Sequence, residues 1–149
     1  MIRTGGCHCG AVRFTAAFAD ETLAGSRCNC TICAMKGAVM VYVPLAAVTV
    51  TKGADVLACY QFNTMAAKHH FCPVCGIHCF HQARSDPHLY AINAATLDDV
   101  RVYEDFPVMP VSDGQNHSLD HGGKRRMAGT LRFEASPDGE WGGMNNLAR

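Results

Sequence analysis

Nine cysteines stand out in this chain of 149 residues, because seven of them fall into three short groups. The groups lie at residues 7–9, 28–33 and 72–75 and read CHC, CNCTIC and CPVC. Cysteines at such spacings are typical of metal ligands or redox catalysts, whereas a secreted disulfide framework usually has an even number and a signal peptide. The count here is odd, and no apolar signal segment follows Met1. We therefore expect a cytoplasmic protein that uses its cysteines for metal or redox chemistry.

The first and third groups together supply four ligands for a structural zinc ion. Residues i and i+2 of a strand point to the same face, so Cys7 and Cys9 can direct both thiolates at one point. A disulfide between them would be strained. Cys72 and Cys75 precede Gly76 in a CxxCG turn that lets two thiolates converge. Zinc lies about 2.3 Å from each sulfur and tolerates both spacings, which predicts a closed Cys₄ site.

The middle group places Cys28, Cys30 and Cys33 within six residues. Three protein ligands with an exchangeable fourth position are the usual design of a catalytic zinc site, and we expect an open site here. The alternative is that a fourth residue closes the site. The candidates for this fourth ligand are His70, Cys79, His8 and His78. Redox cycling of the CxxC at residues 30–33 is a further alternative, but that motif expects a βαβ context that the sequence does not show.

The remaining cysteines and histidines have less specific patterns. Cys59 and Cys79 lie in apolar strand-like segments and are interpreted as buried, small hydrophobic residues. His69 and His70 are neighbours on a predicted strand, so at most one of them can face a metal. Three further histidines fall in segments that we expect to be solvated loops, and they are His88, His117 and His121.

Short alternating or β-branched runs predict a mainly β protein with little helix. The expected strands are 11–15, 39–43, 48–51, 57–62, 68–71, 77–82 and 89–93, with a late one at 131–134. The pairs 57–62 with 68–71 and 77–82 with 89–93 read as hairpins. Single helical turns are expected at 31–36 and 94–99. Many short strands separated by turn residues favour a sandwich or folded-over sheets.

Charge and hydropathy exclude some classes of protein. Lys plus Arg and Asp plus Glu each number 13, so the formal net charge is zero, which disfavours nucleic acid as a partner. No run of 18 apolar residues is present, so we expect no membrane span. The length fits one domain. The composition becomes polar and rich in Pro and Gly after Phe106, and the basic triplet at 124–126 is interpreted as a solvated surface patch.

The order and the flanking residues of the three cysteine groups resemble the glutathione-dependent formaldehyde-activating enzyme family, which includes centromere-protein-V-like proteins. The matching segments are Gly5–Phe14, Cys28–Cys33 and Phe71–Gly76, and the resemblance covers about residues 2 to 106. It implies an Mss4-like fold of stacked antiparallel sheets with zinc knuckles. On this basis we expect a zinc domain at 1–126 and a C-terminal tail at 127–149.

The resemblance also implies two Zn²⁺ per chain and a carbon–sulfur lyase activity. Cys7, Cys9, Cys72 and Cys75 take the structural zinc, and Cys28, Cys30 and Cys33 take the catalytic one. The enzyme would condense a small-molecule thiol, glutathione or a similar one, with formaldehyde or a related aldehyde to an S-hydroxymethyl adduct. Glutathione carries two carboxylates, for which the candidate basic residues are Arg13, Lys36, Lys68 and Arg84.

Three other functions stay open at this point. The chain can be a non-catalytic zinc module, or an enzyme of the same type with a different thiol and aldehyde. It can also be a methionine sulfoxide reductase, whose fold is similar, but which would need Cys59 or Cys79 as a catalytic thiol outside the zinc sites. The sequence leaves self-association into a homo-oligomer open.

Overall fold

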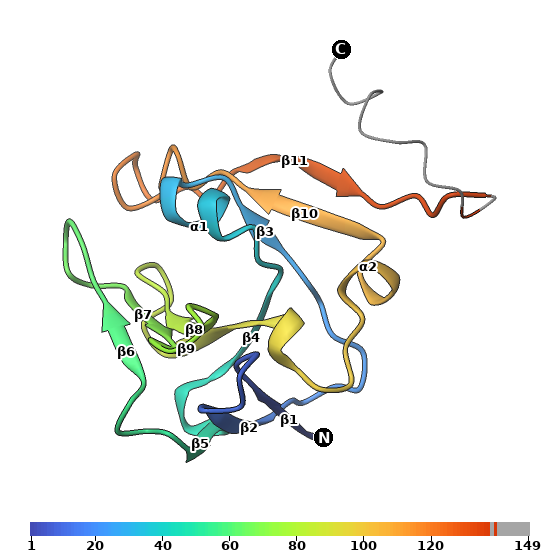
Figure 1. Cartoon of the computed structure of the whole chain (residues 1–149). Helices are drawn as coiled ribbons and strands as arrows, with labels where there is room; N and C mark the ends of the chain where they lie inside the picture. Colours follow the sequence, from blue (N-terminus) through green and yellow to red (C-terminus); the bar gives the residue numbers. More distant parts are fainter. Residues whose placement is uncertain (138, 140–149) are drawn as a thin grey trace.

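Three β-sheets make up the molecule in the computed structural model, which describes residues 1–137 and 139 (Figure 1). The largest sheet has five antiparallel strands in the order β4 (Met40–Pro44), β9 (Leu89–Asn93), β8 (His78–Gln82), β7 (Lys68–Phe71) and β6 (Ala58–Tyr60). A second sheet joins β1 (Ile2–Gly6), β2 (Arg13–Ala17) and β5 (Val48–Lys52). The third joins β11 (Met127–Arg132), β10 (Val108–Ser112) and the short β3 (Arg27–Cys28).

Helical segments are short and connect the strands. They are α1 (Thr31–Lys36), α2 (Val102–Asp105) and the 3₁₀ turns η1 (Leu45–Ala47) and η2 (Ala94–Thr96). Gly37 caps the C-terminus of helix α1, and its φ of 62° allows its backbone N–H to bond the carbonyl of Cys33. No helix among the described residues is long and apolar enough to cross a membrane.

The core lies between the five-stranded sheet and the β1-β2-β5 sheet. Alternation along β2 and the residue before it turns Val12, Phe14 and Ala16 inward, and each is at most 1% exposed. The ring of Phe14 meets that of Phe80 on β8 edge to face, with centroids 5.5 Å apart. Because Phe80 faces this core, its strand neighbour His81 faces the opposite side of the sheet, toward β3, α1 and β10 (Figure 1).

The structure confirms the mainly β class and several of the expected elements. The hairpins β6–β7 and β8–β9 pair antiparallel as predicted. Helix α1 has the predicted bounds, residues 31–36. The helical turn expected at 94–99 is shorter, since only Ala94–Thr96 forms a 3₁₀ turn, with the Asn93 side chain accepting a hydrogen bond from the Ala95 N–H.

Two expectations about solvent exposure are wrong. Cys59 is exposed, because β6 is a three-residue edge strand. Cys79, by contrast, is fully buried as expected. His117, expected to be solvated in a loop, is half-buried and lines the cavity described below, whereas His88 and His121 are exposed. In the C-terminal segment, β11 covers residues 127–132 and begins before the strand expected at 131–134.

Candidate metal centres and the cavity between the sheets

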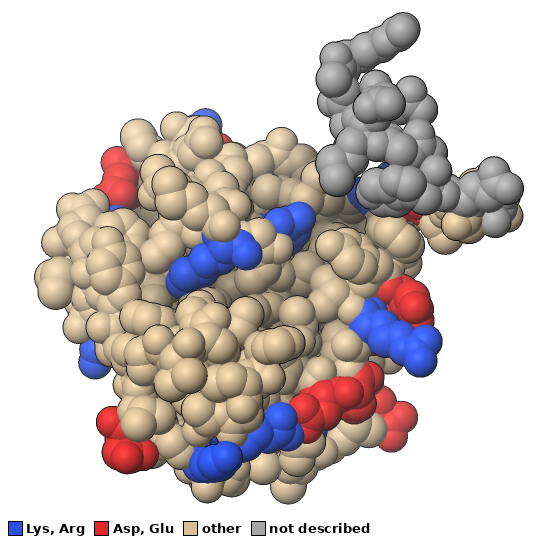
Figure 2. Space-filling view, in the orientation of Figure 1, with Lys and Arg blue, Asp and Glu red and all other residues tan. Residues whose placement is uncertain are grey.

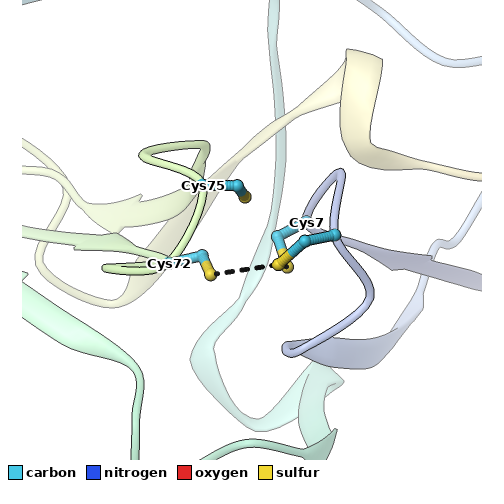
Figure 3. Close-up of side chains that lie close together, drawn as sticks. Cys7, Cys72 and Cys75 are labelled. Carbon is cyan, nitrogen blue, oxygen red and sulfur yellow. Dashed lines mark hydrogen bonds between the residues drawn. The ribbon is translucent and has the colours of Figure 1, made fainter.

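Four cysteine sulfurs converge where the loop after β1 meets the loop between β7 and β8 (Figure 3). The ligand atoms of Cys7, Cys9, Cys72 and Cys75 all lie within 4.8 Å of one another. The Sγ atoms of Cys7 and Cys9 are 3.6 Å apart, and those of Cys9 and Cys72 are 3.8 Å apart. Tetrahedral zinc with bonds of about 2.3 Å places its sulfurs about 3.8 Å from each other. The donor set and the spacing both fit zinc.

Two turns build this four-sulfur cluster. In the first, the N–H of Gly10 bonds the carbonyl of Cys7, with Gly10 at a φ of 74°. In the second, the N–H of Gly76 bonds the carbonyl of Cys72 at 2.8 Å, with Gly76 at a φ of 75°. A positive φ favours glycine at both positions. The Val12 N–H donates to the Cys7 sulfur at 3.2 Å, a contact that stabilises a thiolate.

A second cluster joins β3 to the first turns of α1. The sulfurs of Cys28, Cys30 and Cys33 lie within 4.8 Å of one another, and all three residues are half-buried. The Cys30 N–H lies 3.4 Å from the Cys28 sulfur. Hydrogen bonding by the neighbouring Cys30 and Cys33 sulfurs lowers the pKa of Cys28 to about 2, and Cys28 in turn raises the pKa of Cys33. One thiolate is thus favoured even before a cation is present.

The loop after β10 closes over this three-sulfur cluster. The backbone N–H of Gln115 donates to Oδ1 of Asn29 at 3.0 Å, and Nδ2 of Asn29 donates to Asp113 at 3.3 Å. The Asn29 N–H donates to the carbonyl of Ser112. Asn29 lies between two of the cysteines, so these bonds fix the loop directly against the cluster. No local pattern predicts this contact, because β3 has only two residues.

The three-sulfur cluster opens onto a cavity of about 720 Å³ between the five-stranded sheet and the β3–α1–β10 layer. Cavities of a few hundred to about a thousand Å³ are typical of small-molecule sites. The sheet side contributes Tyr42, His69 and His81, and the opposite wall contributes Gly114 and His117. None of the four cysteines of the first cluster lines this cavity. Only the second cluster is therefore placed to meet a small molecule there.

Charged side chains on the cavity wall are mostly paired. Arg84 donates two hydrogen bonds of 2.7 Å to Asp120, and Arg125 donates one of 2.6 Å to Asp86. Arg126 also lines the cavity and is exposed, and none of the ion pairs found among the described residues includes it. Figure 2 shows basic side chains in the middle of one face and neighbouring basic and acidic ones at its lower edge.

The other basic candidates lie outside the cavity wall. Arg13 pairs with Asp98, and Lys68 is exposed. Lys36 lies behind the wall, where its Nζ is 2.9 Å from Nδ1 of His69. Burial lowers the pKa of Lys36 to about 8.

The four candidates for a fourth ligand lie elsewhere in the described structure. His8 is exposed, and His70 packs against Phe80. Cys79 is buried near the four-sulfur cluster. Its burial and then the nearby charges of Cys7 and Cys72 raise its pKa to about 12. His78 belongs to a different group of side chains. Within the described residues, the three-sulfur group contains no fourth His, Cys, Asp or Glu.

The structure contains a group of buried histidines that the sequence analysis did not predict. His69, His78 and His81 lie together on the cavity side of the five-stranded sheet. Burial is the main cause of their lowered pKa values, which are about 4, about 2 and about 3, respectively. All three rings are therefore uncharged at neutral pH. Spacing gave no signal for this group, because two of its members lie three residues apart on one strand, where regular alternation points them to opposite faces.

Comparison with known proteins agrees with this geometry. The family model described as glutathione-dependent formaldehyde-activating enzyme matches residues 2–110, a segment that carries both cysteine clusters. The chain belongs to this family. A crystal structure of a Rhodobacter sphaeroides protein, solved by structural genomics, is similar at 40% sequence identity and a TM-score of 0.65. The match covers 68% of this chain and 93% of that one.

The family match ends before part of the cavity wall begins. The formaldehyde-activating enzyme model stops at residue 110, whereas residues 112–115, 117, 118, 120, 125 and 126 all contribute to the cavity. Family membership therefore accounts for the cysteine clusters and for the β1–β9 framework. The loop that packs against Cys28 on this wall lies outside the matched segment.

Proposed function

We propose that this chain is a zinc-dependent carbon–sulfur lyase that joins a small thiol to formaldehyde or a related aldehyde. The observation that carries this proposal is the position of Cys28, Cys30 and Cys33, whose three sulfurs converge on the wall of the 720 Å³ cavity. Family membership supplies the reaction class. The other cluster has four sulfurs and no access to the cavity, which suits a structural ion. We therefore assign one Zn²⁺ to each of the two cysteine clusters.

Zinc on the three-sulfur cluster would hold a substrate thiol as the thiolate at neutral pH, where a free thiol is mostly protonated. In the condensation, the substrate sulfur forms a bond to the carbonyl carbon, and the C=O π pair moves to the oxygen. That oxygen takes up the proton that the thiol has lost. The reverse reaction breaks the carbon–sulfur bond, as a lyase does.

The chain's own contribution is to bind and orient the thiol beside the cluster. Asn29 holds the loop that contributes Gly114 to one wall, and the sheet residues His69 and Tyr42 contribute to the other. Arg126 is the candidate to receive a carboxylate, because Arg84 and Arg125 already pair with acidic residues and the half-buried Arg27 donates to the carbonyl of Gly37. A cation that is not neutralised by a partner attracts a substrate carboxylate more strongly.

The charge on the cavity wall bears on the choice of thiol. Of the four arginines on the wall, Arg84 and Arg125 are matched by Asp120 and Asp86, whereas Arg27 and Arg126 are in none of the ion pairs of the described residues. These two arginines can neutralise the two carboxylates of glutathione, and a thiol with a single carboxylate is a second candidate substrate. A reductase that uses Cys59 or Cys79 receives no support, because neither residue lines the cavity.

Exchange spectroscopy by NMR tests the proposal. Hemithioacetal formation runs unaided in water, so the observable is the rate of interconversion of thiol, formaldehyde and adduct. We expect the zinc-loaded protein to increase this rate above buffer, and Cys30→Ser to remove the increase. Cys59→Ser is the matched control, since Cys59 is exposed and belongs to neither cluster. If Cys30→Ser increased the rate as much as the wild-type protein does, the three-sulfur cluster would be excluded from the reaction. No increase with glutathione or a single-carboxylate thiol would favour a non-catalytic zinc module.

A further inference from the structure

Three buried histidines form a compact group that neither the cysteine clusters nor the proposed lyase reaction uses. One ring nitrogen from each of His69, His78 and His81 lies within 4.8 Å of the others. The residues are 3%, 7% and 7% exposed, respectively. The ring centroids of His69 and His81 are 4.8 Å apart, and those of His78 and His81 are 5.4 Å apart. Imidazole rings this close together can bind one metal ion between them.

A β-bulge brings the three rings to one face. His69 on β7 lies opposite His81 on β8, so these two side chains share a face. The register then shifts, and Phe71 lies opposite His78, which leaves Cys79 as the extra residue of β8. A bulge places two residues of one strand opposite one of its partner and re-aims the side chains beyond it. His78 thus faces the same side as His81, although the two are three residues apart.

The ring nitrogens lack the partners that buried polar atoms normally have. Both nitrogens of His78 and Nδ1 of His81 are buried without a hydrogen-bond partner in the described part of the chain. Nδ1 of His69 contacts Lys36 Nζ at 2.9 Å, which leaves its Nε2 available. Nearly all buried polar groups of native proteins are satisfied, and an exception calls for a bound ion, a bound water or a catalytic role. Three such rings within one group point to a ligand that they share.

We propose that His69, His78 and His81 form a third metal site, for a divalent first-row transition metal such as zinc. Uncharged imidazole suits Zn, Cu, Fe and Ni, whereas Mg and Ca prefer oxygen ligands. Three histidine ligands with an open fourth position are typical of catalytic rather than structural zinc. His69 and His81 line the cavity that holds the three-sulfur cluster, so the open position faces the same cavity. The site does not depend on the proposed lyase activity.

Metal stoichiometry tests the site without an activity assay. Protein loaded with excess Zn²⁺ and freed of unbound metal should contain three zinc ions per chain by elemental analysis, and His81→Phe should contain two. The His88→Phe variant is the control, because His88 is exposed outside the group, and it should keep three. His78→Gln, a milder change, should also lose one ion, and circular dichroism verifies that each variant is folded. Two ions in the wild-type protein would overturn the proposal.

Cobalt loading separates this site from the cysteine clusters. Thiolate ligands give Co²⁺ an intense charge-transfer absorption, whereas imidazole ligands do not. We expect the His81→Phe variant to lose one cobalt ion while its charge-transfer absorption stays equal to that of the wild-type protein. Loss of charge-transfer absorption in a folded His81→Phe variant would make His81 a ligand of the three-sulfur site and would overturn a separate histidine site. Long-range nitrogen NMR should show changed chemical shifts for the ring nitrogens of all three histidines when zinc is added. Unchanged ring shifts would contradict the proposed histidine site.

Discussion

Gly114 lies in direct contact with Cys28. A Cβ built on Gly114 would lie 2.4 Å from the Cys28 sulfur and 2.8 Å from the Cβ of Cys30, closer than real side chains approach. The loop after β10 therefore packs its backbone onto the three-sulfur cluster, in a place where only glycine fits. This contact couples the position of the cavity wall to the position of the sulfurs.

Gly114→Ala should disturb the three-sulfur cluster while leaving the fold intact. The added methyl group must displace either the loop or the Cys28 sulfur, so we expect weaker zinc binding there and a loss of catalysis of about tenfold or more, in line with misplacement of reacting groups. Chelator competition and exchange NMR measure the two effects. Gly129→Ala is the control, since a Cβ there has no neighbour within 4 Å. Unchanged zinc affinity in Gly114→Ala would show that the loop moves to make room for the methyl group without disturbing the sulfurs.

The two cysteine clusters should differ in their effect on stability. Metal-binding free energy at a structural site is folding free energy. Cys72 is fully buried, and its replacement by Ser should lower the melting temperature severely, because zinc is lost from between two sheets. Cys30→Ser should lower the melting temperature much less, and Cys59→Ser should leave it almost unchanged. Thermal unfolding followed by circular dichroism measures all three. Equal melting of the Cys72 and Cys30 variants would contradict the division into structural and catalytic sites.

Arg126→Gln should weaken the binding of thiols that carry a carboxylate. The substitution removes the exposed guanidinium from the cavity wall, and the substrate carboxylate loses a charge-assisted contact. This loss corresponds to about a tenfold rise in KM. The KM for a small uncharged thiol should not change. Arg132→Gln is the control, because Arg132 is exposed on β11 away from the cavity. A parallel rise in KM for both kinds of thiol would assign Arg126 a structural role.

Asn29→Ala should loosen the loop after β10. The Asn29 side chain accepts a hydrogen bond from the Gln115 N–H and donates one to Asp113, and each such bond contributes about 1 kcal/mol. We expect faster hydrogen exchange at residues 113–116 with little change in the melting temperature, because the loop lies outside the core. Exchange rates equal to those of the wild-type chain would show that backbone contacts alone hold the loop.

The sequence predicted the parts of the fold that depend on local patterns. Alternation located both hairpins of the large sheet, and spacing identified the seven cysteines that form the two clusters. No strand was predicted at residues 2–6, where the glycines Gly5 and Gly6 weaken the pattern because glycine is depleted in strands; a side chain at Gly5 would meet the carbonyl oxygen of Thr96 at 2.6 Å. The strand β10 was missed because Pro107 and Pro110 argue against a strand.

The histidine group depends on information that a single sequence does not show. Two facing strands and one register shift bring His69, His78 and His81 together, and a bulge has no reliable local signature. The contact between Gly114 and Cys28 joins residues far apart in the chain through a strand pair of two residues. In both cases the pairing of distant segments, rather than the local pattern, determines which side chains meet.

The bulge at Cys79 also constrains which insertions and deletions this chain can accept during evolution. Removing one residue between Cys75 and His81 would restore regular alternation along β8, because the side-chain period of a strand is two. The histidine group would then lose a member, or Phe80 would leave the core, although no ligand had been substituted. Relatives that share the cysteine motifs but differ by one residue in this segment should therefore be treated as a separate group of proteins.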